Sequence, residues 1–186
     1  MTFVLRIHEK NLTKRHHSWL ESTDRYFRMS DNHYHLVLHN PLIPQNTGSI
    51  ARLCAATGAT LHLIHPLGFD TSQAAVKRAG LDYWPHVSVK EHVDWDHFLD
   101  SEKPINLYFF SKFGVVPYTQ AHYTPPVFLV LGSETTGLPP VLRQRHENQL
   151  FNIPIRTHLV RSLNLAQCAA IVLFEAMRQQ DFAGLG

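Results

Sequence analysis

The sequence has few cysteines and no long apolar runs. Only Cys54 and Cys168 occur in 186 residues, and both fall inside apolar helical patterns. This placement indicates buried reduced thiols rather than a disulfide framework. Residues 127–131 form one of the longest apolar runs, which is far shorter than the ~20 residues of a membrane span. The N-terminal stretch lacks the apolar core of a signal peptide. We therefore expect a cytoplasmic protein without a membrane segment.

The chain also has little net charge. Its 17 Lys and Arg residues and 15 Asp and Glu residues give a formal net charge of +2. Residues 1–33 hold six of the basic and four of the acidic residues, which accounts for the whole excess. The rest of the chain is balanced, so its net charge predicts no nucleic-acid footprint. A basic surface would have to come from local clustering.

Two common classes of ligand site lack their sequence signatures. The chain has no G-x-G-x-x-G pattern and no Walker loop, so ordinary dinucleotide and nucleoside triphosphate sites are unsupported. It has 14 histidines, but none forms a zincin helix pair or a Cys/His finger spacing. Scattered histidines are usually surface residues or hydrogen-bonded core residues. We therefore predict no metal site.

Turn residues divide the chain into alternating short apolar runs and amphipathic segments. The apolar runs predict strands at residues 35–39, 60–65, near 87, 105–110, 127–131 and 150–153. The amphipathic segments predict helices at residues 46–57, 72–79, 94–101, just after 140 and 165–180. Because strands and helices alternate, we predict one α/β domain with a mainly parallel sheet and helices on both faces.

Three segments that follow predicted strands are rich in polar residues. They are residues 111–114 (SKFG), 132–137 (GSETTG) and 154–164 (PIRTHLVRSLN). Ligands of such sheets bind beyond the carboxyl ends of the strands, so we expect a site where these loops meet. GSETTG alone has two interpretations. It is either a glycine turn with Glu134 solvated or capping a helix, or one wall of a site.

The third segment ends at the predicted start of the last helix. Residues 164–167 (NLAQ) have the form of a capping box, with Asn164 at the cap and Gln167 three residues on. In one interpretation Ser162 and Asn164 only cap the helix. In the other, Arg156 and Arg161 flank a helix N-terminus whose free N–H groups favour anionic ligand groups. A ligand with an apolar, adenosine-like face and polar ends would suit the three loops.

Three motifs in order carry a resemblance to a known family. They are residues 44–58 (PQNTGSIARLCAATG), 129–139 (LVLGSETTGLP) and 153–179 (IPIRTHLVRSLNLAQCAAIVLFEAMRQ). Together they resemble the motifs of the SPOUT RNA methyltransferases. Residues 65–70 (HPLGFD), 77–84 (KRAGLDYW) and 112–114 (KFG) look like the branch that 2′-O-methylates the wobble nucleotide of tRNA. The resemblance is nearly continuous from about residue 35 to residue 180.

The resemblance implies an α/β fold with a C-terminal trefoil knot, an obligate homodimer, S-adenosylmethionine (SAM) in the knot and tRNA as the substrate. The implied activity is methylation of the first anticodon nucleotide, a cytidine or a modified uridine. The cofactor positions carried over from the family are Phe110, Ser111, Gly132, Glu134, Ile153 and Leu163. The positions carried over for the chemistry are Asn46, Arg52, Glu134, Ser162 and Asn164. Ala166 departs from the family pattern, which commonly has serine there.

Arg52 and Glu134 can be weighed on physical grounds. Related enzymes are thought to use this arginine as a base, but a guanidinium group with a pKa above ~12 would have to become neutral. We therefore expect Arg52 to bind the phosphate next to the target ribose, either within its own subunit or from the partner. We expect Glu134 to anchor loop amides and side chains, which leaves the general base unassigned.

Basic and aromatic residues near the loops are the predicted RNA contacts. The candidate phosphate contacts are Lys77, Arg78, Lys112, Arg143, Arg145, Arg156 and Arg161. Tyr83 and Trp84 offer rings for an unstacked anticodon base, although Trp84 precedes a proline and is equally suited to the core.

The first 32 residues are polar and poorly periodic. We predict a disordered or loosely docked extension there, ahead of a methyltransferase domain at residues 33–186, and Met29 is an alternative start. Two other functions stay open. One is a SPOUT ribose methyltransferase of another RNA, such as ribosomal RNA. The other is a non-catalytic RNA- or nucleotide-binding α/β module.

Overall fold

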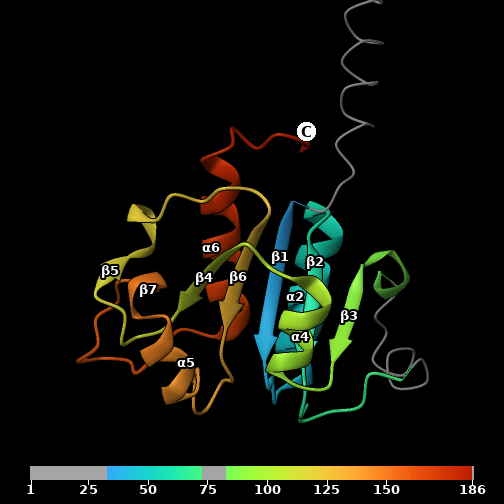
Figure 1. The fold of residues 1–186 in the computed structure, drawn as a ribbon, viewed down its shortest axis with the longest axis horizontal. Coiled ribbons are helices and arrows are strands. Elements are labelled where there is room, and N and C mark those ends of the chain that lie inside the picture. Colours follow the sequence, from blue (N-terminus) through green and yellow to red (C-terminus); the bar gives the residue numbers. More distant parts are fainter. Residues whose placement is uncertain (1–32, 73–82, 186) are drawn as a thin grey trace, which may run out of the picture. The chain divides into compact units, whose positions relative to one another are not determined.

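The computed structural model describes residues 33–72 and 83–185 of the chain. Within them, seven strands form one sheet in the order β3-β2-β1-β6-β4-β7-β5, and its strand pairings are parallel (Figure 1). The strands are β1 (Tyr34–His39), β2 (Thr60–Ile64), β3 (Val89–His92), β4 (Asn106–Phe110), β5 (Val116–Pro117), β6 (Val127–Leu131) and β7 (Leu150–Asn152). The helices are α2 (Pro44–Thr57), α4 (Trp95–Glu102), α5 (Pro140–Arg145) and α6 (Leu165–Arg178). The predicted parallel α/β architecture is confirmed.

Different helices cover the two faces of the sheet (Figure 1). α2 and α6 pack on one face, where they bury Leu36 and Leu38 of β1. α4 and α5 lie on the other face, where Val37 of β1 packs with Phe98 of α4. This division follows from the pleat, because successive side chains of a strand point to opposite faces. The central strand β6 is buried at all five positions, which explains its continuous apolar sequence.

Most predicted elements are present, with ends that shift by one or two residues. α2 begins at Pro44 rather than at residue 46, since proline is favoured in the first helical turn. The strand expected near residue 87 lies instead at Val89–His92 (β3). Its ends are determined by its pairing with β2. β5 is a two-residue strand that the sequence did not predict. Nearly all of the helix expected at residues 72–79, and the N-terminal extension, lie outside the described residues.

The register of the central strands positions the loops of the site. Leu131 at the end of β6 pairs with Leu38 of β1 on one side and with Phe110 of β4 on the other. The chain leaves β1 through α2 to reach β2, whereas β6 and β4 lie on the opposite side of β1. The boundary between β1 and β6 is therefore a topological switch point. The loops after β1, β6 and β4 begin side by side at this boundary.

Three histidines that are far apart in the sequence form a line across the sheet. His35 Nδ1 lies 2.9 Å from His62 Nε2, and His62 Nδ1 lies 3.0 Å from His92 Nε2. His62, His92 and Glu102 also place one potential metal-ligand atom each within 4.8 Å of one another. The carboxylate of Glu102 binds Lys90 Nζ at 2.8 Å. No sequence spacing revealed this cluster, and the expected absence of a metal stays a prediction.

Candidate active site

Two glycines build the turn after β6. A Cβ on Gly132 would lie 2.1 Å from the carbonyl carbon of Gly137 and from the amide nitrogen of Leu138, so only glycine lets the chain return this closely. Gly137 reverses the chain with a φ of 69°. Its amide donates to the Ser133 carbonyl at 2.9 Å, and the hydroxyls of Ser133 and Thr136 lie 2.8 Å apart. Residues 132–137 form a glycine turn that presents Glu134 at the mouth of β6, where the carboxylate is half-buried rather than solvated.

Glu134 accepts hydrogen bonds from the segment that leads into α2. Its Oε2 accepts from the Leu42 amide at 2.8 Å, and its Oε1 accepts from the Ile43 amide at 3.2 Å and from Asn46 Nδ2 at 2.9 Å. Burial alone would raise the pKa of Glu134, but the bonds from Asn46 and the two amides outweigh it and lower that pKa. The carboxylate is therefore ionised at neutral pH, and its oxygens join the loops after β1 and β6.

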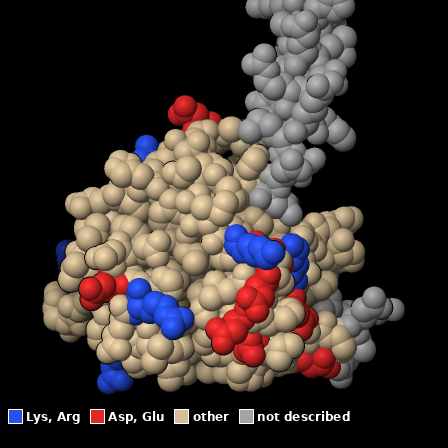
Figure 2. All heavy atoms as spheres, viewed as in Figure 1, with Lys and Arg blue, Asp and Glu red and all other residues tan. Residues whose placement is uncertain are grey.

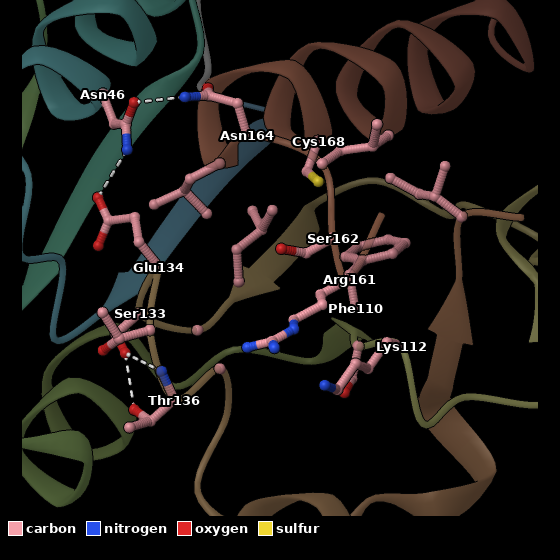
Figure 3. Close-up of a pocket in the computed structure, with 18 of the residues that line it drawn as sticks. Asn46, Phe110, Lys112, Ser133, Glu134, Thr136, Arg161, Ser162, Asn164 and Cys168 are labelled. Carbon is pink, nitrogen blue, oxygen red and sulfur yellow. Dashed lines mark hydrogen bonds between the residues drawn. The ribbon is translucent and has the colours of Figure 1, made fainter. Parts of the chain in front are cut away.

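Asn46 extends this connection to the last helix. Its Oδ1 accepts a hydrogen bond from Asn164 Nδ2 at 2.8 Å (Figure 3). Asn164 also caps α6, because its Oδ1 accepts from the Ala166 amide at 2.8 Å. The predicted cap residue is correct. In a capping box its side chain would accept a bond from the Gln167 amide, but here it accepts from the Ala166 amide. Glu134, Asn46 and Asn164 thus link three chain segments. The pairwise separations of these residues in the sequence range from 30 to 118 positions.

A pocket of about 720 Å³ lies beyond the carboxyl ends of the strands. The three polar loops meet there, as expected from the sequence, together with the start of α2 (Figure 3). All six predicted cofactor positions line it, as do four of the five residues predicted for the chemistry: Phe110, Ser111, Gly132, Glu134, Ile153, Leu163, Asn46, Ser162 and Asn164. This volume suits a ligand of cofactor size.

Two cations and a thiol also line the pocket. The side chain of Arg161 extends into it, and Lys112 lies at its edge (Figure 3). Cys168 lies one helical turn after Asn164 and faces the same space. Burial raises the pKa of the Cys168 thiol, so it stays protonated. Sequence reasoning assigned Cys168 to the core, although its i,i+4 spacing from Asn164 was a usable signal.

Further lining residues were not singled out from the sequence. They belong to the same loops or to the ends of the same elements, namely Ile43, Phe113, Leu131, Ser133, Thr135, Thr136, Gly137, Ile155 and Leu165. Their neighbours along the chain were predicted, and each of the three expected loops contributes residues to the pocket. The residues marked by sequence motifs thus include both polar and apolar members of this lining.

Arg52 does not line the pocket. It lies on the exposed side of α2, and its Cζ is 4.8 Å from the centre of the Tyr83 ring. The structure therefore separates Arg52 from the other four residues predicted for the chemistry, at least within one chain. Spacing along α2 agrees with this, because residues six positions apart on a helix, such as Asn46 and Arg52, point in different directions.

The predicted RNA contacts are spread over the surface. Lys112 and Arg161 line the pocket, and Arg143 packs with its Cζ 4.2 Å from the centre of the Phe113 ring. Arg156 lies in the exposed loop after β7, whereas Lys77 and Arg78 lie outside the described residues. On the face seen in Figure 2, the surface of the described residues is mostly uncharged, and its basic side chains lie in separate small groups rather than in a continuous basic surface. This pattern agrees with the balanced charge of the chain.

A parallel α/β sheet with a ligand-sized pocket at its switch point defines the class of protein: an α/β fold that binds a small molecule beyond its strand ends. Residues 33–174 match the model of the SpoU rRNA Methylase family, and the chain belongs to this family.

Several relatives are similar over most of their length. A tRNA (cytidine(34)-2′-O)-methyltransferase of Burkholderia ambifaria is 43% identical over 81% of this chain and 98% of its own. A Geobacillus stearothermophilus protein named provisionally for the same activity is 47% identical over 81% of this chain and 98% of its own. A solved structure described as giving insight into the 2-OH methylation of C/U34 on tRNA has a TM-score of 0.74 and 41% identity, over 81% of this chain and 99% of that one.

A more distant structure contains the cofactor that the resemblance implied. It is an AdoMet-bound rRNA methyltransferase of Sinorhizobium meliloti, with a TM-score of 0.69 and 28% identity over 78% of this chain and 56% of that one. AdoMet is another name for SAM. This chain therefore shares its fold with a methyltransferase whose structure contains bound SAM.

Proposed function

We propose that this protein is a SAM-dependent tRNA methyltransferase that 2′-O-methylates the wobble nucleotide, a cytidine or a modified uridine. One observation carries the proposal. In a chain of the SpoU family, Glu134, Asn46 and Asn164 join the three segments that enclose one pocket at the switch point of the sheet. The names of the relatives at 43–47% identity supply the class of substrate.

The lining residues fit SAM by their chemistry. Phe110, Ile153 and Leu163 offer apolar surface for an adenine ring, and Gly132 lines the same pocket with its backbone. The polar side of the pocket holds Ser111 and the start of α6, which suit the polar ends of the cofactor. Bound SAM supplies an electrophilic methyl group. We also propose that the segment from β7 to α6 passes through a loop of the chain as the trefoil knot of SPOUT proteins.

The chain's own residues have to align the ribose hydroxyl and help remove its proton, since this hydroxyl is a poor nucleophile at neutral pH. Ser162 and Asn164 line the pocket at the start of α6, where they can orient the hydroxyl by hydrogen bonding. Glu134 is occupied as an acceptor for three donors, so we assign it an anchoring role. Arg52 would bind the phosphate beside the target ribose.

Arg52 can reach a pocket if the protein is a homodimer. It does not line the pocket of its own chain. Leu42 and Ile43, next to the pocket, are 39% and 41% exposed, and Leu159 and Val160 in the loop before α6 are 66% and 47% exposed. A second copy that covers these apolar side chains would remove them from water and bring its Arg52 to the site. We propose this homodimer as the active form.

Subunit complementation tests this arrangement. We expect Arg52→Ala and Asn164→Ala to be inactive separately, and a refolded mixture to recover about a quarter of wild-type activity. Random pairing puts half of the subunits in mixed dimers. If Arg52 acts across the interface, each mixed dimer has one complete site and one incomplete site, so a quarter of all sites are complete. A mixed sample that stays inactive would mean that Arg52 serves its own subunit. Sedimentation of the wild type at micromolar concentration checks the dimer independently.

For RNA binding we propose that Lys112, Arg143, Arg156 and Arg161 contact phosphates, together with Lys77 and Arg78. No helix among the described residues is long and apolar enough to span a membrane. We propose that the enzyme acts in the cytoplasm, where its tRNA substrate is found.

The activity is tested with labelled SAM and undermethylated tRNA, followed by digestion and mapping of the modified nucleosides. We expect the label on the 2′ oxygen of the first anticodon nucleotide. Label on a base, or no label on any RNA, would refute the proposal. Label on ribosomal RNA alone would favour the alternative that the family description suggests. Calorimetry that shows no SAM binding would favour a non-catalytic RNA-binding module.

A further inference from the structure

Tyr83 lies against α2 at the turn that carries Arg52. Its hydroxyl donates to the Gly48 carbonyl at 2.8 Å, a bond between residues 35 positions apart. Its ring centre lies 4.8 Å from the Cζ of Arg52. Gly48 and Arg52 are separated by four residues, so they lie one above the other on the same side of the helix. Tyr83 therefore binds the helix backbone at one point and the arginine side chain one turn further on.

This arrangement restrains the guanidinium group without neutralising it. Arg52 is exposed, and an exposed arginine samples many rotamers, so holding it in one place costs conformational entropy. No salt bridge of the described residues includes Arg52. A carboxylate in the place of Tyr83 would compete with an RNA phosphate for the N–H groups. A ring face attracts the cation and leaves those donors for a ligand.

We propose that Tyr83 is a positioning residue that holds Arg52 ready for an RNA phosphate. This inference rests on the proposed function, and it assigns Tyr83 a different role from the base stacking expected from the sequence. The hydroxyl anchor to Gly48 fixes where the ring lies, and the ring fixes where the guanidinium lies. Tyr83 acts on the reaction through Arg52 and has no contact with the reacting atoms.

Two replacements separate the anchor from the ring. Tyr83→Phe keeps the ring face and removes the bond to Gly48, whereas Tyr83→Leu removes both. In single-turnover methyl transfer to tRNA by the full-length protein, we expect Tyr83→Leu to lower the rate about tenfold and Tyr83→Phe about two- to threefold, within the range of a partly exposed cation–π contact and one neutral hydrogen bond. The affinity for SAM should stay within error of the wild type for both variants, and Tyr83→Phe should lower the Tm by only a few degrees, as expected of one lost hydrogen bond.

The Arg52→Ala background shows whether Tyr83 acts through Arg52. We expect Arg52→Ala to weaken tRNA binding, measured by filter retention at fixed salt, and Tyr83→Leu to add no further weakening in that background. A further loss there would mean that Tyr83 itself contacts RNA, for example by base stacking, and would overturn the inference. So would a Tyr83→Leu variant that transfers methyl groups as fast as the wild type, or one that loses SAM affinity as much as activity. A wild-type protein that methylates no tRNA would instead refute the proposed function, and with it any role for Tyr83 in that reaction.

Discussion

The replacement Glu134→Gln tests whether this carboxylate is an anchor or the catalytic base. Three donors converge on it: the amides of Leu42 and Ile43 and the Nδ2 of Asn46. Glutamine keeps the shape but replaces one acceptor oxygen with an NH₂ group. In the better orientation its oxygen serves Ile43 and Asn46, and its nitrogen faces the Leu42 N–H. One charge-assisted bond is then lost, two donors oppose each other, and the two remaining bonds are to a neutral oxygen, so the one lost bond sets the lower limit of the cost.

The expected loss in the free energy of unfolding follows from the hydrogen bond that is lost. A hydrogen bond to a charged group contributes about 1.5–3 kcal/mol, and partial exposure of Glu134 favours the lower half of this range, so we expect a loss of about 2 kcal/mol. For a domain of this size such a loss lowers the Tm by about 4–8 °C. Because the same turn lines the pocket, we expect SAM to bind about tenfold more weakly, which corresponds to about 1.4 kcal/mol.

Scanning calorimetry and titration calorimetry with SAM measure both quantities, and labelled methyl transfer measures activity. Glu147→Gln is the matched control, because it makes the same chemical change at an exposed carboxylate that does not line the pocket. It should change neither Tm nor SAM affinity by a comparable amount. The reasoning would be refuted if Glu134→Gln kept the wild-type Tm and SAM affinity but lost methyl transfer together with the acidic limb of its pH–rate profile. That result would identify Glu134 as the base.

Three further outcomes are expected. Gly132→Ala should unfold the turn or cost more than about 3 kcal/mol in urea denaturation, since its Cβ would lie 2.1 Å from backbone atoms. Gly137→Ala has open space around its Cβ but a φ of 69°, so it should cost about 1–2 kcal/mol. Equal costs for the two variants would contradict the close approach at Gly132. Burial lowers the pKa of His62 from 6.5 to about 2, so the unfolded chain takes up a proton that the folded one does not, and stability should fall by about 2 kcal/mol from pH 7.5 to pH 5 through this group. His62→Gln should remove one proton from the pH slope of the unfolding free energy, and an unchanged slope would contradict this. Asn164→Ala should cost about 2 kcal/mol, about 1 for the lost helix cap and about 1 for the lost bond to Asn46, and Asn164→Ser should restore the cap but neither the second bond nor methyl transfer; restored transfer would make Asn164 only a cap.

Sequence patterns predicted the elements well where local chemistry defines them. α2 ends at residue 57 as predicted, where Gly58 follows with a φ of 72°, and Asn164 begins α6. β3 was misplaced because its polar sequence, with Val89 and His92 turned inward, becomes a strand by pairing with β2. Such non-local pairing leaves little trace in a short window of sequence.

The candidate site likewise has features that the sequence predicted and features that it did not. Motifs identified the loops and most of the polar residues, because the chemistry of a glycine turn or a helix cap is written in a few neighbouring residues. They did not show that Glu134 would bond to Leu42, Ile43 and Asn46, since these partners are 88 to 92 positions away. Nor did they show that Arg52 would lie apart from the pocket and against Tyr83.

The sequence by itself determined the alternation of strands and helices, the glycine turn, the cap of α6 and the family resemblance, all of which depend on short-range patterns. Only the tertiary structure decided which of these residues meet. The register of β1 against β6 brings Glu134 to the entry of α2, and the return of α6 beside α2 brings Asn164 to Asn46. The physical reason is that strand register and helix packing are properties of the whole buried core, and a short segment of sequence contributes only one side of each contact.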